Sequence, residues 1–161
     1  MKRVLIVDDE VDISELISLI LKKEGIDSKI INNPLEVPEL VKKEKFDLIL
    51  LDIMMPELSG TELCSKIRDV VDAPIIFISA KSELIDKMLG YEIGGDDYIT
   101  KPFDNTELLL KVKELEGLLE NRDAIISELT EKLKEAEAKL HQSVEDFSKT
   151  TSKKKTIYDF K

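Results

Sequence analysis

Residues 47–56 read DLILLDIMMP, a stretch in which four apolar residues lead directly into Asp52. Short apolar runs of this kind, without polar alternation, are typical of strands buried on both faces of a parallel sheet. The chain contains two further runs like it and two weaker strand patterns. The five predicted strands lie at about residues 4–7, 28–31, 48–51, 75–78 and 97–100.

Helical patterns fill the intervals between these strands. The first covers about residues 11–24 and ends at Gly25, a residue that readily adopts the left-handed conformation found at helix ends. Asn33-Pro34 predicts the start of a second helix, with a capping side chain followed by proline in the first turn. Pro38 lies four residues later, so this helix is expected to bend or to start late.

Three further helices are expected downstream. The third follows Gly60, and its apolar side is formed by Leu63, Ile67 and Val70. The fourth starts near Ser82, and the fifth at Asp104 with Glu107 in the spacing of a capping box. Strand and helix thus alternate five times, which predicts an α/β fold with right-handed crossovers and a doubly wound five-stranded parallel sheet. In such sheets ligands bind beyond the carboxyl ends of the strands.

Polar residues lie at four of these strand ends: Asp8, Asp9, Asp52, Ser79, Thr100 and Lys101. Carboxylates held close together repel one another unless their pKa values rise or a cation binds between them. Hard oxygen ligands favour Mg²⁺, which binds a few carboxylates together with phosphate oxygens. An aspartate can attack phosphorus while a metal and a lysine neutralise the transferring group. The cluster is therefore suited to accepting a phosphoryl group.

These residues also carry a family resemblance, in four ordered motifs. The motifs are VLIVDDE at 4–10, DLILLDIMMP at 47–56 with Ser59-Gly60, Ser79-Ala80, and GDDYITKPF at 95–103. Together they resemble the response-regulator receiver domains of two-component systems, over about residues 1–116. The resemblance implies a (βα)5 flavodoxin-like receiver whose aspartate is phosphorylated by a sensor histidine kinase. It implies no enzymatic activity beyond Mg²⁺-dependent self-phosphorylation and autodephosphorylation.

The same resemblance assigns roles to individual residues. It implies phosphorylation of Asp52, with Mg²⁺ held by Asp9, Asp52 and the backbone carbonyl of Met54, and by Asp8 through water. Lys101 would contact the phosphoryl oxygens and precede a cis bond to Pro102. Ser79 would hydrogen-bond the phosphoryl group, and the ring of Tyr98 would change rotamer with it.

Residues 87–113 are similar to the winged-helix (OmpR/PhoB-like) branch, whose receivers form dimers through the fourth helix, fifth strand and fifth helix. The resemblance implies three ion pairs across a two-fold axis, each occurring twice. The pairs are Lys87 with Glu107, Glu92 with Lys113, and Asp97 with Lys111. The alternative is that these are solvated surface charges, which contribute about 0 to 1 kcal/mol per pair.

After Lys113 the sequence predicts a long C-terminal helix. Apolar residues recur every seven positions, which is the pattern of a coiled-coil seam: Leu119, Ile126, Leu133, Leu140 and Phe147. The companion positions are weaker, namely Leu115, Arg122, Leu129, Ala136 and Ser143, so packing on another partner is an open alternative. Gly117 is a candidate hinge. The helix is therefore expected to add to the homodimer contact.

Three segments are predicted: a receiver at 1–116, a helical or coiled-coil extension at 117–148, and a basic linker at 149–161. Residues 149–155 favour a flexible linker, and 156–160 alternate like the first residues of a strand. The linker is expected to lead to an output domain. The DNA-binding half of the winged-helix branch is not recognisable, so a coiled-coil signalling adaptor or a single-domain regulator stays open.

Charge, cysteine content and single residues disfavour several other classes of protein. The formal net charge of −10 disfavours direct nucleic-acid binding, because a polyanion is repelled by most of this surface. Cys64, the single cysteine, fits a small hydrophobic residue in a reducing compartment. No stretch resembles a signal peptide or membrane span, so a cytoplasmic protein without membrane contact is expected. An aspartate-nucleophile phosphohydrolase is disfavoured because Met54 stands where a second aspartate is needed.

Overall fold

The computed structural model describes residues 3–80 and 94–158, with side chains through Thr150. By their contacts the residues divide into two units, Met1–Glu116 and Gly117–Lys161. The predicted fourth helix, near Ser82, lies outside the described residues. None of the helices among those residues combines the length and the apolar character that a membrane span requires.

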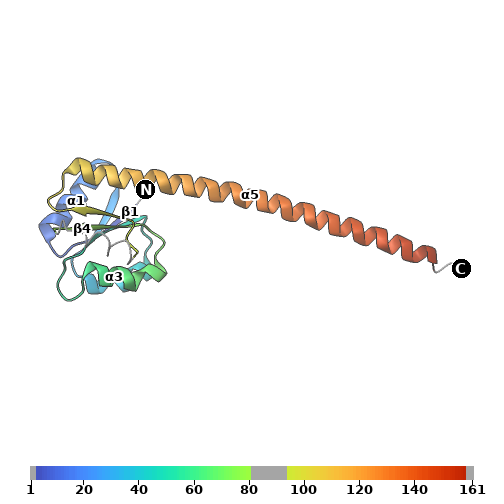
Figure 1. The fold of residues 1–161 in the computed structure, drawn as a ribbon, viewed down its shortest axis with the longest axis horizontal. Coiled ribbons are helices and arrows are strands. Elements are labelled where there is room, and N and C mark those ends of the chain that lie inside the picture. The colour runs from blue at the N-terminus through green and yellow to red at the C-terminus, as the bar shows by residue number, and fades with distance from the viewer. Residues whose placement is uncertain (1–2, 81–93, 159–161) are drawn as a thin grey trace. The chain divides into compact units, whose positions relative to one another are not determined.

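The first unit is built on one parallel sheet of five strands (Figure 1). The strands are β1 Arg3–Val7, β2 Asp27–Ile31, β3 Leu48–Asp52, β4 Ile75–Ser79 and β5 Asp97–Thr100. Their order is β2-β1-β3-β4-β5, so the chain changes direction across the sheet between β1 and β3. Val7 pairs with Leu51, and this register places Asp8 beside Asp52. The predicted doubly wound sheet is confirmed.

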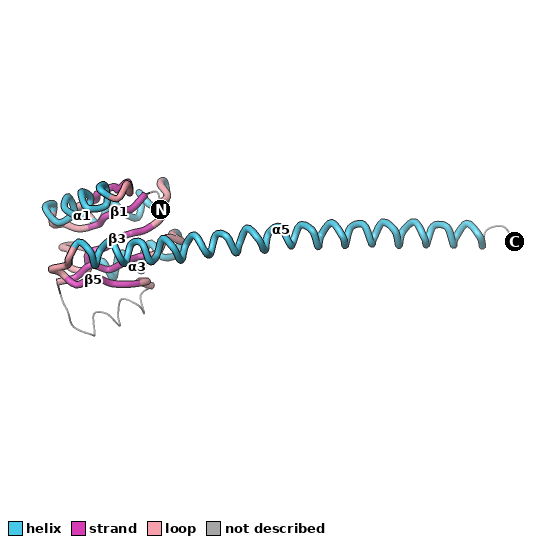
Figure 2. The backbone as a smooth tube through the Cα atoms, turned by 90° about the horizontal axis from the view of Figure 1, so that it is seen from above, coloured by secondary structure: helices cyan, strands magenta, loops and turns pink. Residues whose placement is uncertain are grey.

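Helices cover both faces of the sheet, as Figures 1 and 2 show. The helices are α1 Val11–Lys23, α2 Val37–Lys43, α3 Gly60–Ile67 and α5 Asn105–Tyr158, with 3-10 turns η1 Pro34–Glu36 and η2 Arg68–Val70. One core joins α1 and the first turns of α5 to Ile6, Leu50 and Ile78. The other joins α2 and α3 to Leu51 and Phe77. The alternate residues of each strand therefore point to opposite cores, which explains their continuous apolar runs.

The predicted helix ends mostly hold. α1 ends just before Gly25, whose φ is 75°. The Asn33 side chain accepts a hydrogen bond from the Leu35 N–H, and the η1 turn precedes α2, so the late start predicted from Pro38 is confirmed. Asp104 accepts a hydrogen bond from the Thr106 N–H at the start of α5.

Two expectations about side chains and boundaries were wrong. Val70 is 46% exposed, while Leu63 and Ile67 are buried, because α3 ends at Ile67 and the chain tightens into η2. Residues 149–158 are helical, although the sequence predicted a flexible linker and then a strand. This segment contains no proline or glycine, so nothing in its backbone ends the helix that precedes it.

The helix α5 also runs through Gly117 without a break, although the sequence marked this residue as a candidate hinge. A Cβ atom at Gly117 would meet no heavy atom within 4 Å. Gly117→Ala is therefore expected to stabilise this helix by about 0.5 to 1 kcal/mol, because alanine loses less backbone entropy than glycine. Amide exchange around residues 113–121 should slow. Unchanged or faster exchange would mean that this glycine is needed as a hinge.

Candidate functional site

Three strand ends place charged side chains at one edge of the sheet. Asp8 follows β1, Asp52 ends β3, and Lys101 follows β5. The Lys101 Nζ lies 2.9 Å from Asp8 Oδ2 and 3.4 Å from Asp52 Oδ2. It also lies 3.1 Å from Glu10 Oε1. Lys101 is thus the shared cation of a cluster drawn from strands far apart in the sequence.

Within this cluster the two aspartates are largely removed from water, whereas the Glu10 side chain is 60% exposed. Asp52 is 3% exposed and Asp8 is 1% exposed. Burial, and then the negative charge of Asp8, raise the pKa of Asp52 to about 6, against the opposing charge of Lys101. Burial alone would lower the pKa of Lys101, but its bonds to Asp8 and Glu10 and the charge of Asp52 raise it above its usual value. Lys101 therefore keeps its positive charge at neutral pH.

Backbone groups fix the two buried aspartates. Asp8 Oδ1 accepts the Glu10 N–H at 2.9 Å, and the Asp8 carbonyl accepts the Asn32 side-chain amide at 2.7 Å. Asp52 Oδ1 accepts the Met54 N–H at 3.3 Å. One oxygen of each carboxylate is thus held by the backbone while the other faces Lys101. No sequence motif pointed to Asn32, which follows β2 and is brought here by the pairing of β1 with β2.

Lys101 is positioned by the peptide bonds on either side of it. The bond to Pro102 is cis, as the resemblance implied. The Lys101 N–H donates to the Ser79 carbonyl at 2.6 Å, which continues the pairing of β4 with β5 by one residue. Ser79 itself is 5% exposed and ends β4. Its register with Thr100 places the predicted switch hydroxyl at the same edge of the sheet as Lys101.

The site fits a hard cation. Among the described residues, Asp8, Glu10 and Asp52 each offer a carboxylate oxygen within 4.8 Å of the others. Asp9 Oδ1 is buried and has no hydrogen-bond partner there, and a buried oxygen without a donor is a group that a cation would satisfy. Asp9 was predicted as a ligand but is not among the three carboxylates that the structure groups together, and Glu10, which was not predicted, is one of them. Glu10 directly follows the two aspartates, which was the available signal.

Tyr98 lies on β5 and packs against the core that contains Phe77. The Lys111 ammonium lies 5.7 Å from the centre of the Tyr98 ring. Lys111 also bonds both carboxylate oxygens of Asp97, at 2.8 and 2.7 Å. The Lys111 ammonium therefore contacts both the Asp97 carboxylate and the ring of Tyr98, the next residue along the chain.

The residues of the predicted dimer face are partly described. Asp97 and Lys111 pair within the chain, and Lys113 pairs with Glu24 at 2.7 Å. Glu107 is exposed in the first turn of α5. Lys87 and Glu92 lie outside the described residues. Pairing of these groups across two chains stays a prediction.

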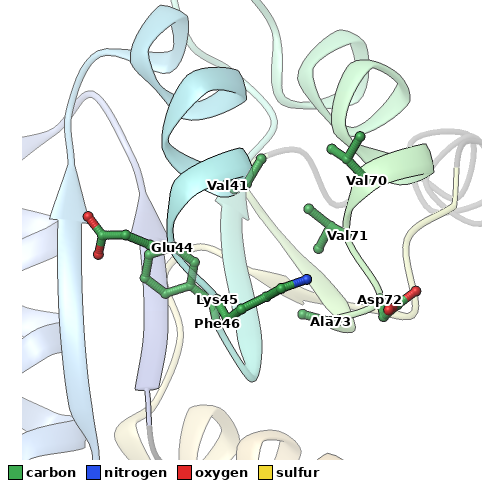
Figure 3. Close-up of a pocket in the computed structure, with 8 residues that line it drawn as sticks. All are labelled: Val41, Glu44, Lys45, Phe46, Val70, Val71, Asp72 and Ala73. Carbon is green, nitrogen blue, oxygen red and sulfur yellow. The ribbon is translucent and has the colours of Figure 1, made fainter.

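A separate crevice lies at the opposite ends of the strands from this cluster (Figure 3). Its volume is about 70 Å³, and its lining includes Val41, Phe46 and Val71. Phe46 precedes β3 and Val71 precedes β4, so the crevice is beyond the amino ends of the strands. It shares no residue with the cluster around Lys101.

Comparisons with known proteins agree with this fold. The family model of the response regulator receiver domain matches residues 4–113, and the chain belongs to this family. The transcriptional regulatory protein CpxR homolog of Haemophilus influenzae is 42% identical over 113 residues, which are 70% of this chain. Those residues cover 49% of the relative, so this chain spans about half the length of that protein.

Solved structures give the same answer. The receiver domain of the Francisella response regulator 1452 has a TM-score of 0.67 and 34% identity, covering 71% of this chain and 96% of that one. A CheY-like receiver domain protein from Methanospirillum hungatei has a TM-score of 0.70 and 32% identity, covering 75% of this chain and 98% of that one. The predicted receiver fold is therefore confirmed.

Proposed function

We propose that this chain acts as a two-component response regulator, which accepts a phosphoryl group on Asp52 from a sensor histidine kinase. The observation that carries the proposal is the placement of Lys101 Nζ, 3.4 Å from Asp52 and 2.9 Å from Asp8. A lone buried carboxylate would have no cation for an incoming phosphoryl group. Here the charge is already in place beside the acceptor.

In the proposed reaction, a carboxylate oxygen of Asp52 attacks the phosphorus of a phosphohistidine. A P–O bond forms to Asp52 as the P–N bond to the imidazole breaks, and the product is an acyl phosphate. Lys101 pairs with the phosphoryl oxygens, exchanging a contact with Asp52 for one with the transferred group. Burial raises the pKa of Asp52 only to about 6, which is still below neutral pH. The carboxylate is therefore mostly ionised there, as a nucleophile must be.

The proposed cofactor is Mg²⁺, held by Asp9, Asp52 and the backbone carbonyl of Met54, with Asp8 acting through water. When bound, the ion supplies positive charge against the phosphoryl oxygens. Glu10 is a further group within reach of the cluster. We expect the ion to compete with Lys101 for the carboxylates of Asp8 and Asp52, because both cations meet the same oxygens.

Phosphorylation is proposed to act through Ser79 and Tyr98. Ser79 would hydrogen-bond the new phosphoryl group, and the Tyr98 ring would then change its rotamer. The resulting change in β5 and α5 would release Lys111 from Asp97 of its own chain for pairing in a homodimer. The similarity to the Haemophilus influenzae transcriptional regulatory protein supports placement in the winged-helix branch and a role in transcription regulation.

No catalysis beyond self-phosphorylation and autodephosphorylation is proposed, and no direct nucleic-acid or membrane binding by this chain. A second candidate, a coiled-coil signalling adaptor, is favoured by the exposed apolar residues of α5, among them Leu133 and Leu140. In that case the receiver would be a folded platform. The two differ in whether phosphorylation changes assembly.

The test is intact mass and oligomeric size after incubation with Mg²⁺ and a small phosphodonor. Native protein should gain one phosphoryl adduct and form more dimer, whereas Asp52→Asn should gain none. Asp69→Asn is the matched control, because Asp69 is an exposed aspartate in η2, and it should behave like the native protein. An adduct that persists in Asp52→Asn would refute the assignment of the acceptor. At a concentration where the unphosphorylated protein is partly monomeric, an adduct without any change in size would favour the adaptor.

A further inference from the structure

The described part of the second unit is helical and carries a row of exposed apolar side chains. Four of these residues, which are 54 to 66% exposed, are called the seam: Ile126, Leu129, Leu133 and Leu140. Their spacings of three, four and seven residues place them on one face of α5. Ala136 fills the remaining position between Leu133 and Leu140. A face of this kind is expected to be covered in the working protein.

From the seam we propose that residues 126–147 of α5 form a parallel, in-register, two-stranded coiled coil with a second copy of this chain. The seam residues then occupy the heptad core, with Ile126, Leu133 and Leu140 at one core position and Leu129 and Ala136 at the other. The association needs neither Asp52 nor a phosphoryl group. It therefore goes beyond the proposed function.

Charges beside the seam select a second parallel copy. In a parallel pair, a residue that flanks the core on one helix faces the residue five positions later on the other. Lys132 therefore faces Glu137 of the second chain, and the pair occurs twice. The other flanking pairs bring no like charges together, because Ile125 faces Thr130 and Lys139 faces Val144.

An antiparallel pair would be opposed by the same residues. Packing Leu133 against Ala136 in opposite directions sets Lys132 against Lys139 of the second chain. Shifting that pairing by one heptad sets Lys132 against its own copy. Like charges in these flanking positions are unfavourable, and no acidic residue replaces them in either arrangement. A shift by one heptad in the other direction pairs Lys132 with Asp146 of the second chain, but it sets Lys139 and Glu137 each against its own copy. Only the parallel arrangement gives Lys132 an attractive partner without bringing like charges together.

Residues on the opposite face fit solvent. Glu131, Ala138 and Glu145 lie farthest from the seam and are all exposed. On the flank, Lys132 bonds Glu128 of its own helix at 2.5 Å, a contact that stabilises the helix without involving the seam. The polar and apolar faces are thus separated as a two-stranded coil requires.

The first test is sedimentation equilibrium of the full chain without phosphodonor or Mg²⁺. We expect a reversible monomer–dimer equilibrium, and Leu140→Glu should raise the dissociation constant at least about a hundredfold, since each dimer then buries two charges. Ala138→Glu adds the same charge on the opposite face and should leave the constant unchanged. A native protein that stays monomeric, or a trimer, would overturn the proposal.

The parallel orientation of the two helices is tested by cysteine cross-linking. Ala136→Cys places two thiols across the core of a parallel, in-register pair, close enough for a disulfide, whereas Ala138→Cys places them on outer faces. The native Cys64 is fully buried and should not compete. Rapid cross-linking of Ala136→Cys alone is expected. Equal rates for the two variants would contradict the parallel register.

The charge pair is tested by reversal. Lys132→Glu should weaken the dimer about threefold or more, and adding Glu137→Lys should restore it by re-forming the pair with its signs exchanged. Glu128→Gln is the control for the contact within the helix. If Lys132→Glu instead strengthens the dimer, the helices are antiparallel, because a glutamate would then face Lys139.

These outcomes are separable from the proposed function. Asp52→Asn should dimerise through the seam as well as the native protein does. A chain that is monomeric without phosphodonor but still gains one phosphoryl adduct would refute the coiled coil and leave the receiver function standing. A dimeric chain without an adduct would support the coiled coil and refute the receiver function.

Discussion

Gly60→Ala is expected to destabilise the first unit by about 3 kcal/mol, more than any surface substitution in this chain. A Cβ atom at this position would lie 2.0 Å from the Asp52 carbonyl oxygen and 2.9 Å from the Ile53 Cα. Both are backbone atoms of the segment that carries the phosphoacceptor. Relief of the overlap therefore requires either α3 or the end of β3 to move.

Gly60 is held against this segment from its own side as well. Its N–H donates to the Ile53 carbonyl at 2.9 Å, and α3 starts there with Ser59 and Glu62 in a reciprocal capping box. Displacing α3 would strain both arrangements. The same contact explains why a glycine sits near the acceptor: the helix start supports the backbone that aims Asp52.

The measurement is urea unfolding with amide exchange of β1 and β3 as the local readout. Gly117→Ala is the matched control, because the same added methyl group there meets open space and should stabilise. If Gly60→Ala unfolds within about 0.5 kcal/mol of the native protein, the close approach is not a constraint. A folded Gly60→Ala protein should still be phosphorylated more slowly, since Asp52 would have shifted.

Much of the fold could be predicted because its strands are buried on both faces. Residues 48–51 have no polar alternation, and in the structure all four are fully buried. The positions of the strand ends followed from these runs, and Asp8, Asp52 and Lys101 therefore met as expected.

The remaining details depend on contacts that a pattern cannot show. Asn32 holds the Asp8 carbonyl only because β2 pairs with β1, and Glu10 reaches Lys101 by the geometry of one turn. The end of α3 placed Val70 in water although its spacing fits the apolar face. Composition alone also suggested a linker at 149–155, where the absence of a helix breaker decided for helix.

Removing the charge of Asp52 is expected to stabilise the protein when divalent metal is absent. The pKa of Asp52 is raised from 3.8 to about 6 in the folded state, mainly by burial and then by Asp8. Between these two values the folded protein binds more protons than the unfolded chain, so the free energy of unfolding falls as pH rises. The loss is complete above the folded pKa. Asp52→Asn has no such proton to release, so its free energy of unfolding does not fall in this way.

The expected difference is measurable by urea unfolding in EDTA. Between pH 4.5 and 7.5 the stability advantage of Asp52→Asn over the native protein should grow by about 2 kcal/mol, since one pKa unit corresponds to about 1.4 kcal/mol. Asp8→Asn should not show this gain, because it removes the shortest ion pair of Lys101. Adding Mg²⁺ at pH 7.5 should stabilise the native protein and narrow the gap. A gap that is constant with pH would mean that Asp52 ionises in the folded protein as readily as in the unfolded chain, and that Lys101 fully compensates its burial.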